Sequence, residues 1–268
     1  MYNKIITDLT NREYHSNREA VSNSQLSRIA RSPALFNAPS KTTPALRWGT
    51  LVHGIVLEPG EFLNLAAVMP EGLDKGKGKT ERVEKFEAEN SAKIVVTSTE
   101  YRQLLDIRKA VFEDADAGLL FTSPARTEHS LFWVDEATGV KCRCRPDFWR
   151  NDGIVVDLKT TADCSEYGFG RSAYDYRYFA QAAFYWDGIK AVTGTAPEAF
   201  IFVAVEGKES PEIFVESYNV EAEELEFGRA CYRKTLQTYK DCKASGVWPK
   251  KLKTGIRKLK MPRWAELG

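Results

Sequence analysis

The sequence contains no apolar run long enough to cross a membrane. Its first residues also lack the charged and apolar regions of a signal peptide, so we expect a cytoplasmic protein without a membrane partner. Cysteine is scarce, with 5 residues and no Cys-x-x-Cys pair, which favours neither a disulfide framework nor a zinc knuckle. The formal net charge of +1 neither supports nor excludes a nucleic-acid ligand.

The 268 residues are enough for one domain with a substantial core, so we predict a single domain over 1–268. Basic residues gather in two places. A glycine-rich stretch at 71–90 is predicted to be a mobile basic loop with a short helix around 83–88, and a second basic segment covers 250–263. Such runs are usually solvated surface, and the alternative is contact with DNA phosphates.

End signals and periodic apolar residues predict several helices. Serine, threonine or proline marks the expected N-terminal ends of the helices, and glycine follows the expected C-terminal ends of two of them. The expected helices cover about 22–32, 44–57, 98–116, 172–192 and 221–245.

Apolar runs rich in β-branched residues predict the strands. They are expected at about 94–96, 128–134, 140–149, 154–159, 199–205 and 213–218. The expected order is helices first, then antiparallel strands, then helices around further strands. This order predicts an α/β (α+β) sandwich.

Chemistry-bearing residues are concentrated between Asp147 and Lys159. Asp147 and Asp157 lie symmetrically about Asp152 in a predicted turn, so antiparallel pairing brings them nearly opposite each other, with Cβ atoms about 5 Å apart. Lys159 lies two residues beyond Asp157, and the period of a strand puts both side chains on one face. Two carboxylates so close repel each other, and a divalent cation between them is the usual remedy.

The same alternation divides the preceding strand into a charged side and an apolar side. The charged side carries Arg143, Arg145 and Asp147. The apolar side carries Val140, Cys142 and Cys144, and we interpret these cysteines as core residues.

Two aspartates and a lysine in this arrangement suit phosphodiester hydrolysis. Carboxylate oxygens hold Mg²⁺ or Mn²⁺, and such an ion polarises a phosphate and lowers the pKa of a bound water. A lysine can orient that water, help to deprotonate it, or stabilise the transition state. The alternative interpretation is a surface hairpin with structural salt bridges.

Two further features favour a functional site. Tyr178, Gln181 and Tyr185 are spaced to form one polar-aromatic stripe on a predicted helix, although a partly exposed helix face would also explain them. His53 lies one turn after Gly49 on another predicted helix, where a structural role is the alternative to a ligand role.

Short segments in a fixed order carry a resemblance to a known family. They are residues 14–15, 22–26, 32–36, 49–53, 57–59, 128–133, 144–147, 157–161, 181–185 and 259–264. Together they make the chain resemble the RecE-type exonucleases over nearly its whole length. These enzymes are a branch of the lambda-exonuclease and RecB-like nucleases within the PD-(D/E)XK superfamily.

The resemblance implies a restriction-endonuclease-like core, which is a central mixed sheet flanked by helices. It also implies a site for Mg²⁺, with Mn²⁺ as a substitute. The implied metal ligands are His53, Asp147, Asp157 and the Leu158 carbonyl. The implied catalytic lysine is Lys159, with Glu128, Gln181 and Tyr185 supporting the site or contacting DNA.

The resemblance further implies 5′–3′ digestion of linear double-stranded DNA, which leaves 3′ single strands for a RecT-like annealing protein. A homo-oligomeric ring around the DNA is expected with it. The alternatives are another nuclease on the same core, such as an endonuclease or a Cas4-like nuclease, and a catalytically inactive DNA-binding module. Cas4-like proteins need four cysteines for an iron–sulfur cluster, and Cys142 and Cys144 lie inside the predicted catalytic strand instead.

Overall fold

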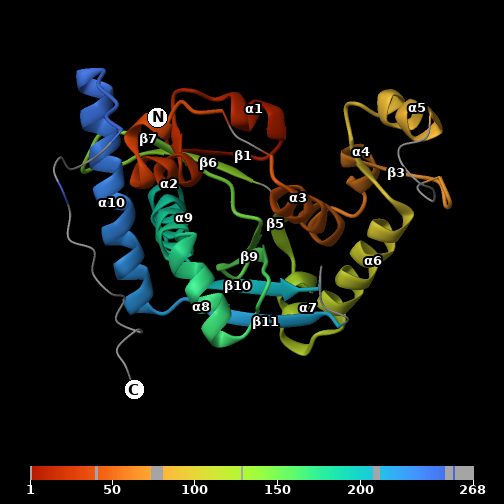
Figure 1. Ribbon diagram of the computed structural model, residues 1–268. Coiled ribbons are helices and arrows are strands. Elements are labelled where there is room, and N and C mark those ends of the chain that lie inside the picture. Colours follow the sequence, from red (N-terminus) through yellow and green to blue (C-terminus); the bar gives the residue numbers. More distant parts are fainter. Residues whose placement is uncertain are drawn as a thin grey trace.

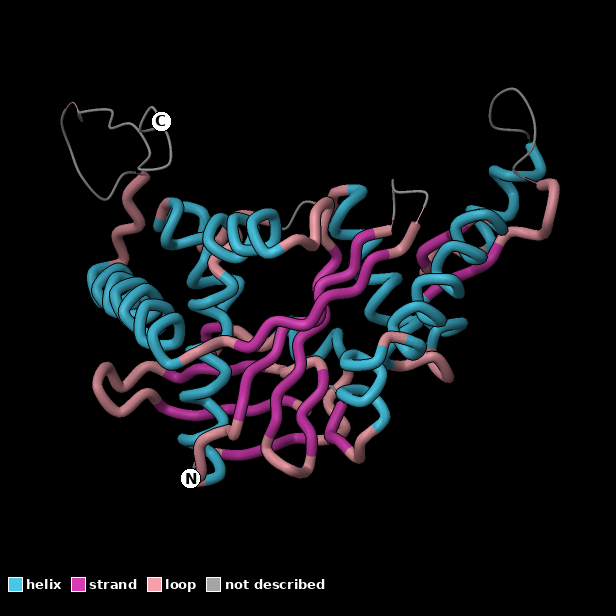
Figure 2. Tube along the Cα trace, turned by 90° about the horizontal axis from the view of Figure 1, so that it is seen from below, coloured by secondary structure: helices cyan, strands magenta, loops and turns pink. Residues whose placement is uncertain are grey.

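Two mixed sheets lie at the centre of the molecule, with helices on both sides (Figures 1 and 2). The computed structural model describes residues 2–39, 42–73, 81–127, 129–207, 212–250 and 256. Lys75, Lys77 and Lys79 of the expected basic loop, and most of the expected basic segment at 250–263, lie outside these ranges.

The strands divide between two larger sheets and one small pair. The first sheet has the spatial order β1 (Lys4–Ile6), β6 (Ser130–Val134), β7 (Lys141–Cys144) and β2 (Val21–Ser22). The second has the order β11 (Phe214–Asn219), β10 (Ala199–Glu206), β9 (Ile154–Thr160), β8 (Phe148–Arg150) and β5 (Ala125–Thr127). The small pair is β3 (Ala66–Val68) with β4 (Ile94–Val96). Parallel pairing of β9 with β10 and of β2 with β7 makes both larger sheets mixed.

The helices flank the sheets, and several begin after a residue whose side chain accepts a first-turn N–H group, such as Thr10, Thr97 and Asp114. They are α1 (Asn11–Ser16), α2 (Asn23–Arg31), the 3-10 helix Pro33–Leu35, α3 (Pro44–Leu57), α4 (Phe62–Leu65), α5 (Glu81–Glu89), α6 (Ser98–Glu113), α7 (Ala115–Thr122), α8 (Glu166–Asp175), α9 (Tyr178–Thr193) and α10 (Ala222–Ser245). The predicted cap at Thr43 is present, because its side chain accepts the Leu46 N–H. The expected helix over 98–116 stops earlier, since Asp114 caps the first N–H groups of α7 instead.

The expected α/β architecture of mixed sheet and flanking helices is confirmed, although two sheets share the strands that were expected in one. α9 and α10 lie on one side of the strands, and α3, α6 and α7 lie on the other (Figure 1). No helix among the described residues is both long and apolar enough to span a membrane.

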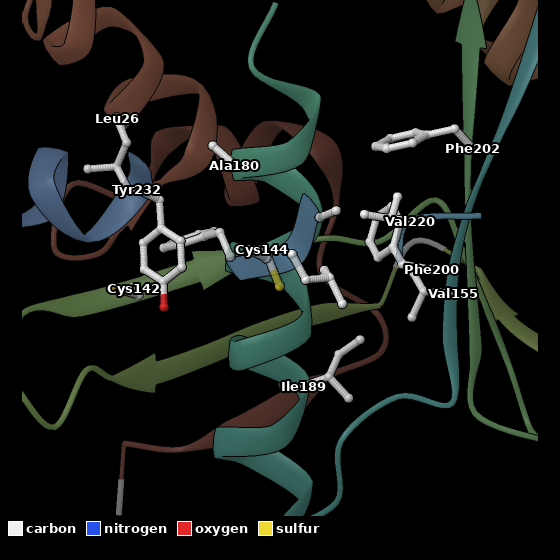
Figure 3. Packing of buried hydrophobic residues seen from close by; sticks show 14 of the residues in the cluster. Leu26, Cys142, Cys144, Val155, Ala180, Ile189, Phe200, Phe202, Val220 and Tyr232 are labelled. Atoms are coloured by element: carbon white, nitrogen blue, oxygen red, sulfur yellow. The ribbon is translucent and has the colours of Figure 1, made fainter. Parts of the chain in front are cut away.

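The five-stranded sheet has a separate core on each face. Along β9, Val155 points to the core that includes α9 and α10, whereas Val156 and Leu158 point to the core that includes α3 and α6. Figure 3 shows the first core, in which Val155 and Phe202 pack with residues of α9. Asp157 is on the same face of β9 as Val155, so the sheet presents its carboxylate toward α9.

Small residues let α9 approach its neighbours closely. A Cβ atom at Gly228 of α10 would lie 2.0 Å from the carbonyl oxygen of Phe179, so only glycine fits there. Ala180 and Ala182 are buried on α9 (Figure 3 labels Ala180). This packing fixes the position of α9 and therefore of the Gln181 side chain that it carries.

The strand expected over 140–149 is two strands that belong to different sheets. β7 ends at Cys144 and β8 begins at Phe148, with Pro146 between them. Proline cannot donate a hydrogen bond to a neighbouring strand, so the ladder is interrupted at this point. The break lets the chain pass from one sheet to the other and leaves Asp147 immediately before β8.

The expected charged side of this segment is buried rather than open. Arg143 and Arg145 are only 3% and 8% exposed. Arg145 donates hydrogen bonds to Ser130 and Asn11, and the ring of Tyr14 lies 4.8 Å and 4.5 Å from the two guanidinium carbons. The N-terminal segment therefore covers this side, which the alternation of residues alone could not show.

The single helix expected over 172–192 is also divided in two. Arg177 separates α8 from α9 and has a φ of 63°, a left-handed conformation that is uncommon outside glycine. Its guanidinium donates to the Cys231 carbonyl and the Thr235 hydroxyl of α10. The break between α8 and α9 is thus accompanied by contacts with α10. The spacing of apolar residues along the sequence does not reveal these contacts.

Candidate active site

The two aspartates meet where β8 pairs with β9. Phe148 lies opposite Val156 in this antiparallel pair, so the same register places Asp147 level with Asp157. The Leu158 N–H donates to Asp147 Oδ2 at 3.0 Å, which ties the residue before β8 to the backbone of β9. The symmetric spacing in the sequence predicted this register.

Asp157 lies at the centre of the site, with a side chain that is only 1% exposed. Gln181 Nε2 donates to its Oδ2 at 2.6 Å, and the Lys159 ammonium forms an ion pair with its Oδ1. Burial raises the pKa of Asp157 to about 6; repulsion from Asp147 adds to the rise, while Lys159 and His53 oppose it. The charge of Asp157 thus depends on its immediate neighbours.

Lys159 is held between carboxylates and aromatic rings. Its Nζ lies 4.8 Å from the ring centroid of Tyr178 and 5.6 Å from that of Phe202. Burial lowers the pKa of Lys159, but attraction to Asp157 and Asp147 outweighs it, so the pKa is raised above its ordinary value. Lys159 is therefore a cation at neutral pH.

His53 reaches the same site from α3. Its Nδ1 lies 3.4 Å from Asp147 Oδ2. α3 approaches the end of β9 closely, since a Cβ atom at Gly49 would lie 3.4 Å from Thr160 Oγ1. Leu158 lies between Asp157 and Lys159 in β9, and its side chain is buried in the opposite core. Only its backbone is therefore available to the site.

A cavity of about 240 Å³ adjoins Asp147. Asp147, Gln181, Tyr185 and Arg145 form one part of its wall. Burial raises the pKa of Tyr185 well above its ordinary value, so its phenol stays protonated. The N-terminal segment supplies the rest of the wall, namely Asn11, Tyr14, His15, Ser22, Asn23 and Ser24.

The structure brings most of the predicted site residues together. Those in one cluster are His53, Asp147, Asp157, Leu158, Lys159 and Gln181, with Tyr185 on the adjoining cavity wall. Glu128 lies outside the described residues. Sequence reasoning gave no role to Phe202 or to the N-terminal wall of the cavity. Tyr178 was noted only as part of a stripe, and its contact with Lys159 follows from the packing of α9 on β9 and β10.

The donor atoms suit a divalent cation of the Mg²⁺ type. Two carboxylates close enough to repel each other, a backbone carbonyl and an imidazole form a mainly hard-oxygen set. In the part of the chain that the structure describes, no three His, Cys, Asp or Glu side chains are grouped to hold a metal by themselves. Asp157 is instead neutralised by the Lys159 ammonium. The oxygen and nitrogen donors of the site therefore fit a divalent cation by their chemistry. The Lys159 ammonium lies beside Asp157, which is one of these donors.

The sequence matches the model of a family described as a PDDEXK-like domain of unknown function (DUF3799) over residues 22–255. The chain belongs to this family. The PDDEXK-like match spans the candidate site from His53 to Tyr185. No curated protein matches the sequence. The expected PD-(D/E)XK superfamily is thus confirmed, whereas the RecE-type branch stays a prediction.

A solved structure shares the fold of this PDDEXK-like protein. A presumed exonuclease from Eubacterium rectale superposes with a TM-score of 0.65 at 16% identity, covering 95% of this chain and 96% of its own. An alkaline exonuclease from Laribacter hongkongensis is a more distant match, with a TM-score of 0.28, 12% identity and coverage of 63% and 87%. By family and by fold, then, the chain is PDDEXK-like.

Proposed function

We propose that this PDDEXK-like protein is a Mg²⁺-dependent 5′–3′ exodeoxyribonuclease that degrades linear double-stranded DNA and leaves 3′ single strands. One observation carries the proposal. Asp157 is buried between the Lys159 ammonium and the Gln181 amide, with Asp147 beside it on the paired strand. Burying a carboxylate in this way raises its pKa and is costly, and such arrangements cluster at functional sites.

Each residue of the site has a part in phosphodiester cleavage. Asp147, Asp157, His53 and the Leu158 carbonyl would hold the Mg²⁺, with Mn²⁺ as a substitute, and the bound ion would polarise the phosphate. Lys159 is a cation and can donate to a phosphate oxygen, where it stabilises the negative charge that develops. Gln181 holds the carboxylate of Asp157 in a fixed orientation through its hydrogen bond.

The exonuclease form of the proposal is supported by the ordered sequence segments and by the fold shared with the presumed exonuclease. Its natural substrate would be the ends of double-stranded DNA. The resemblance extends the proposal to a homo-oligomeric ring that encloses the DNA and to a RecT-like single-strand annealing protein as partner.

The first experiment compares linear and closed circular DNA. We expect the protein to degrade linear 5′-phosphorylated duplex DNA with Mg²⁺, to leave the circle intact, and to stop when EDTA is added. Asp157→Asn should lower the rate by about 1000-fold or more, because it removes a ligand and the negative charge that faces Lys159. Asp152→Asn is the matched control, since Asp152 is an exposed carboxylate in the turn of the same hairpin.

Each part of the proposal can fail separately. Cutting of the closed circle would make the protein an endonuclease on the same core. Release of a 3′-end label before a 5′-end label would reverse the proposed polarity. Folded protein that cleaves neither DNA with Mg²⁺ or Mn²⁺ would contradict the proposal and favour a catalytically inactive DNA-binding module.

A further inference from the structure

Two aromatic rings lie against the ammonium of Lys159 in the candidate active site. Its Nζ is 4.8 Å from the ring centroid of Tyr178 and 5.6 Å from that of Phe202. Both distances are within the roughly 6 Å at which the face of a ring attracts a cation. Only 14% of the Lys159 side chain is exposed, so little water screens this attraction. The two rings are thus a second set of partners for the ammonium, beside the Asp157 carboxylate.

The register of the sheet brings the Phe202 ring to this position. β10 runs parallel to β9, with Phe202 opposite Asp157 and Ala204 opposite Lys159. Residues opposite each other on paired strands point to the same face, so the Phe202 ring lies on the face that carries the lysine. The small side chain of Ala204 leaves room for the lysine stem to pass toward the rings of Phe202 and Tyr178. Strand pairing therefore decides which ring of β10 lies next to the ammonium.

A third ring fixes the orientation of the other two. The ring centroids of Tyr178 and Phe202 lie 5.6 Å apart, and that of Phe169 on α8 lies 6.0 Å from each of them. Phe202 and Phe169 are only 1% and 3% exposed. Close packing of this kind leaves each ring few alternative rotamers. The rings therefore form a rigid surface, whereas the lysine stem that ends on it is flexible.

A bound divalent cation would change which partner holds the lysine. In the structure Asp157 pairs with the Lys159 ammonium and is repelled by Asp147. A cation held by both carboxylates, as proposed above, would take over this pairing and repel the ammonium. An uncharged ring keeps its attraction for the ammonium whether or not the cation is present. Tyr178 and Phe202 are therefore the partners that can keep the lysine in the loaded site.

We propose that Tyr178 and Phe202 are positioning residues, which hold the Lys159 ammonium beside the two aspartates while a divalent cation occupies them. The proposal rests on the proposed nuclease function and deepens it. A lysine held in this way can meet a phosphate oxygen without first being ordered, and such preorganisation accelerates a reaction. Tyr178 acts through its ring, so its hydroxyl is not required.

Nuclear magnetic resonance tests the contact directly, without DNA and without turnover. A ring current shifts protons that lie over a ring upfield, so the ¹³C-labelled Lys159 side chain should show upfield Hε signals. Lys159→Arg assigns these signals by removing them. We expect the upfield shift in the metal-free protein and again at saturating Mg²⁺, whose binding is followed by calorimetry. Tyr178→Phe should keep most of the shift, and Tyr178→Leu should lose most of it.

Kinetics separate positioning of the lysine from support of the fold. Tyr178→Leu should lower kcat for degradation of linear DNA by about tenfold, the size of one cation–π contact, with KM changed by less than about twofold. Tyr178→Phe should keep the parent rate. Tyr239→Leu is the matched control, because the ring of Tyr239 on α10 is also buried, packs on Phe36 and lies 5.5 Å from the Lys243 ammonium. It should lower the thermal midpoint and leave kcat unchanged.

Three outcomes would overturn the proposal. An upfield shift that disappears at saturating Mg²⁺ would show that the lysine leaves the rings when the cation binds. A Tyr178→Phe variant as slow as Tyr178→Leu would assign the effect to the hydroxyl. Equal losses of kcat in Tyr178→Leu and Tyr239→Leu would mean a general loss of packing.

Failure of the proposed nuclease function is seen separately. Folded protein that neither binds Mg²⁺ nor degrades DNA would remove both proposals. The three outcomes above would instead leave the nuclease in place and remove only the positioning role of the rings.

Discussion

At the scale of the residue, Asp157 has the most constrained environment in the candidate site. Its carboxylate is buried, repelled by Asp147, paired with Lys159 and hydrogen-bonded by Gln181. A buried carboxylate without partners would be protonated, whereas these contacts let it keep a charge that a cation can share. Loss of any partner is therefore expected to change function before it changes the fold.

Gln181→Met tests the contribution of one such partner. Methionine has a similar length but cannot donate to Asp157, and a hydrogen bond to a charged group contributes about 1.5–3 kcal/mol. We expect nucleotide release from linear DNA to slow by roughly 10- to 100-fold while the circular dichroism spectrum stays unchanged. Gln237→Met on α10 is the control, because that amide bonds an exposed aspartate. Equal rates for the two variants would show that the amide of Gln181 is not needed.

At the scale of the element, α9 connects the core to the chemistry. Its small residues pack against the sheets and α10, while Gln181 and Tyr178 on the same helix contact Asp157 and Lys159. Gly228 sets how closely α10 can approach, and the break at Arg177 sets where α9 begins. A change in helix packing should therefore reach the site.

Gly228→Ala tests this coupling. The added methyl group would meet the Phe179 carbonyl at 2.0 Å, so the helices must separate. We expect a loss of about 1–3 kcal/mol, seen as a thermal midpoint lowered by roughly 2–12 °C, together with slower DNA degradation. Gly170→Ala is the matched control: it has open space around it and should stabilise α8 by about 0.5–1 kcal/mol. An unchanged midpoint for Gly228→Ala would mean that the helices can separate freely.

At the scale of the whole molecule, the site joins parts of the chain that are far apart in sequence. α3 supplies His53, the β8–β9 hairpin supplies the aspartates and lysine, and α9 supplies the glutamine. A cation that binds across these elements would bind only the folded chain, and such binding stabilises a fold by mass action.

Mg²⁺ should therefore raise the thermal midpoint of unfolding. At free Mg²⁺ about 100 times the dissociation constant the gain is about 2.7 kcal/mol, or roughly 5–10 °C for a chain of this size. EDTA should reverse the shift, and Asp147→Asn should remove most of it. Asp152→Asn, an exposed carboxylate of the same hairpin, should leave it intact. A shift of equal size in both variants would locate Mg²⁺ binding elsewhere on the protein.

Local signals in the sequence determined much of the fold. Capping residues and period-two alternation predicted α2, α3, α10 and β9 with their ends nearly correct. The spacing of Asp147 and Asp157 about a turn predicted their register, because antiparallel pairing depends only on the residues between them. These features depend on near neighbours in the chain, so a single sequence is sufficient to specify them.

Only the tertiary structure decided the rest. The burial of Arg143 and Arg145 depends on the N-terminal segment that covers them, and the left-handed Arg177 is accompanied by bonds to α10. The approach of His53 and Gln181 to the aspartates depends on how α3 and α9 pack on opposite faces of one sheet. Contacts between distant segments are set by packing of the whole core, and local propensity does not report them.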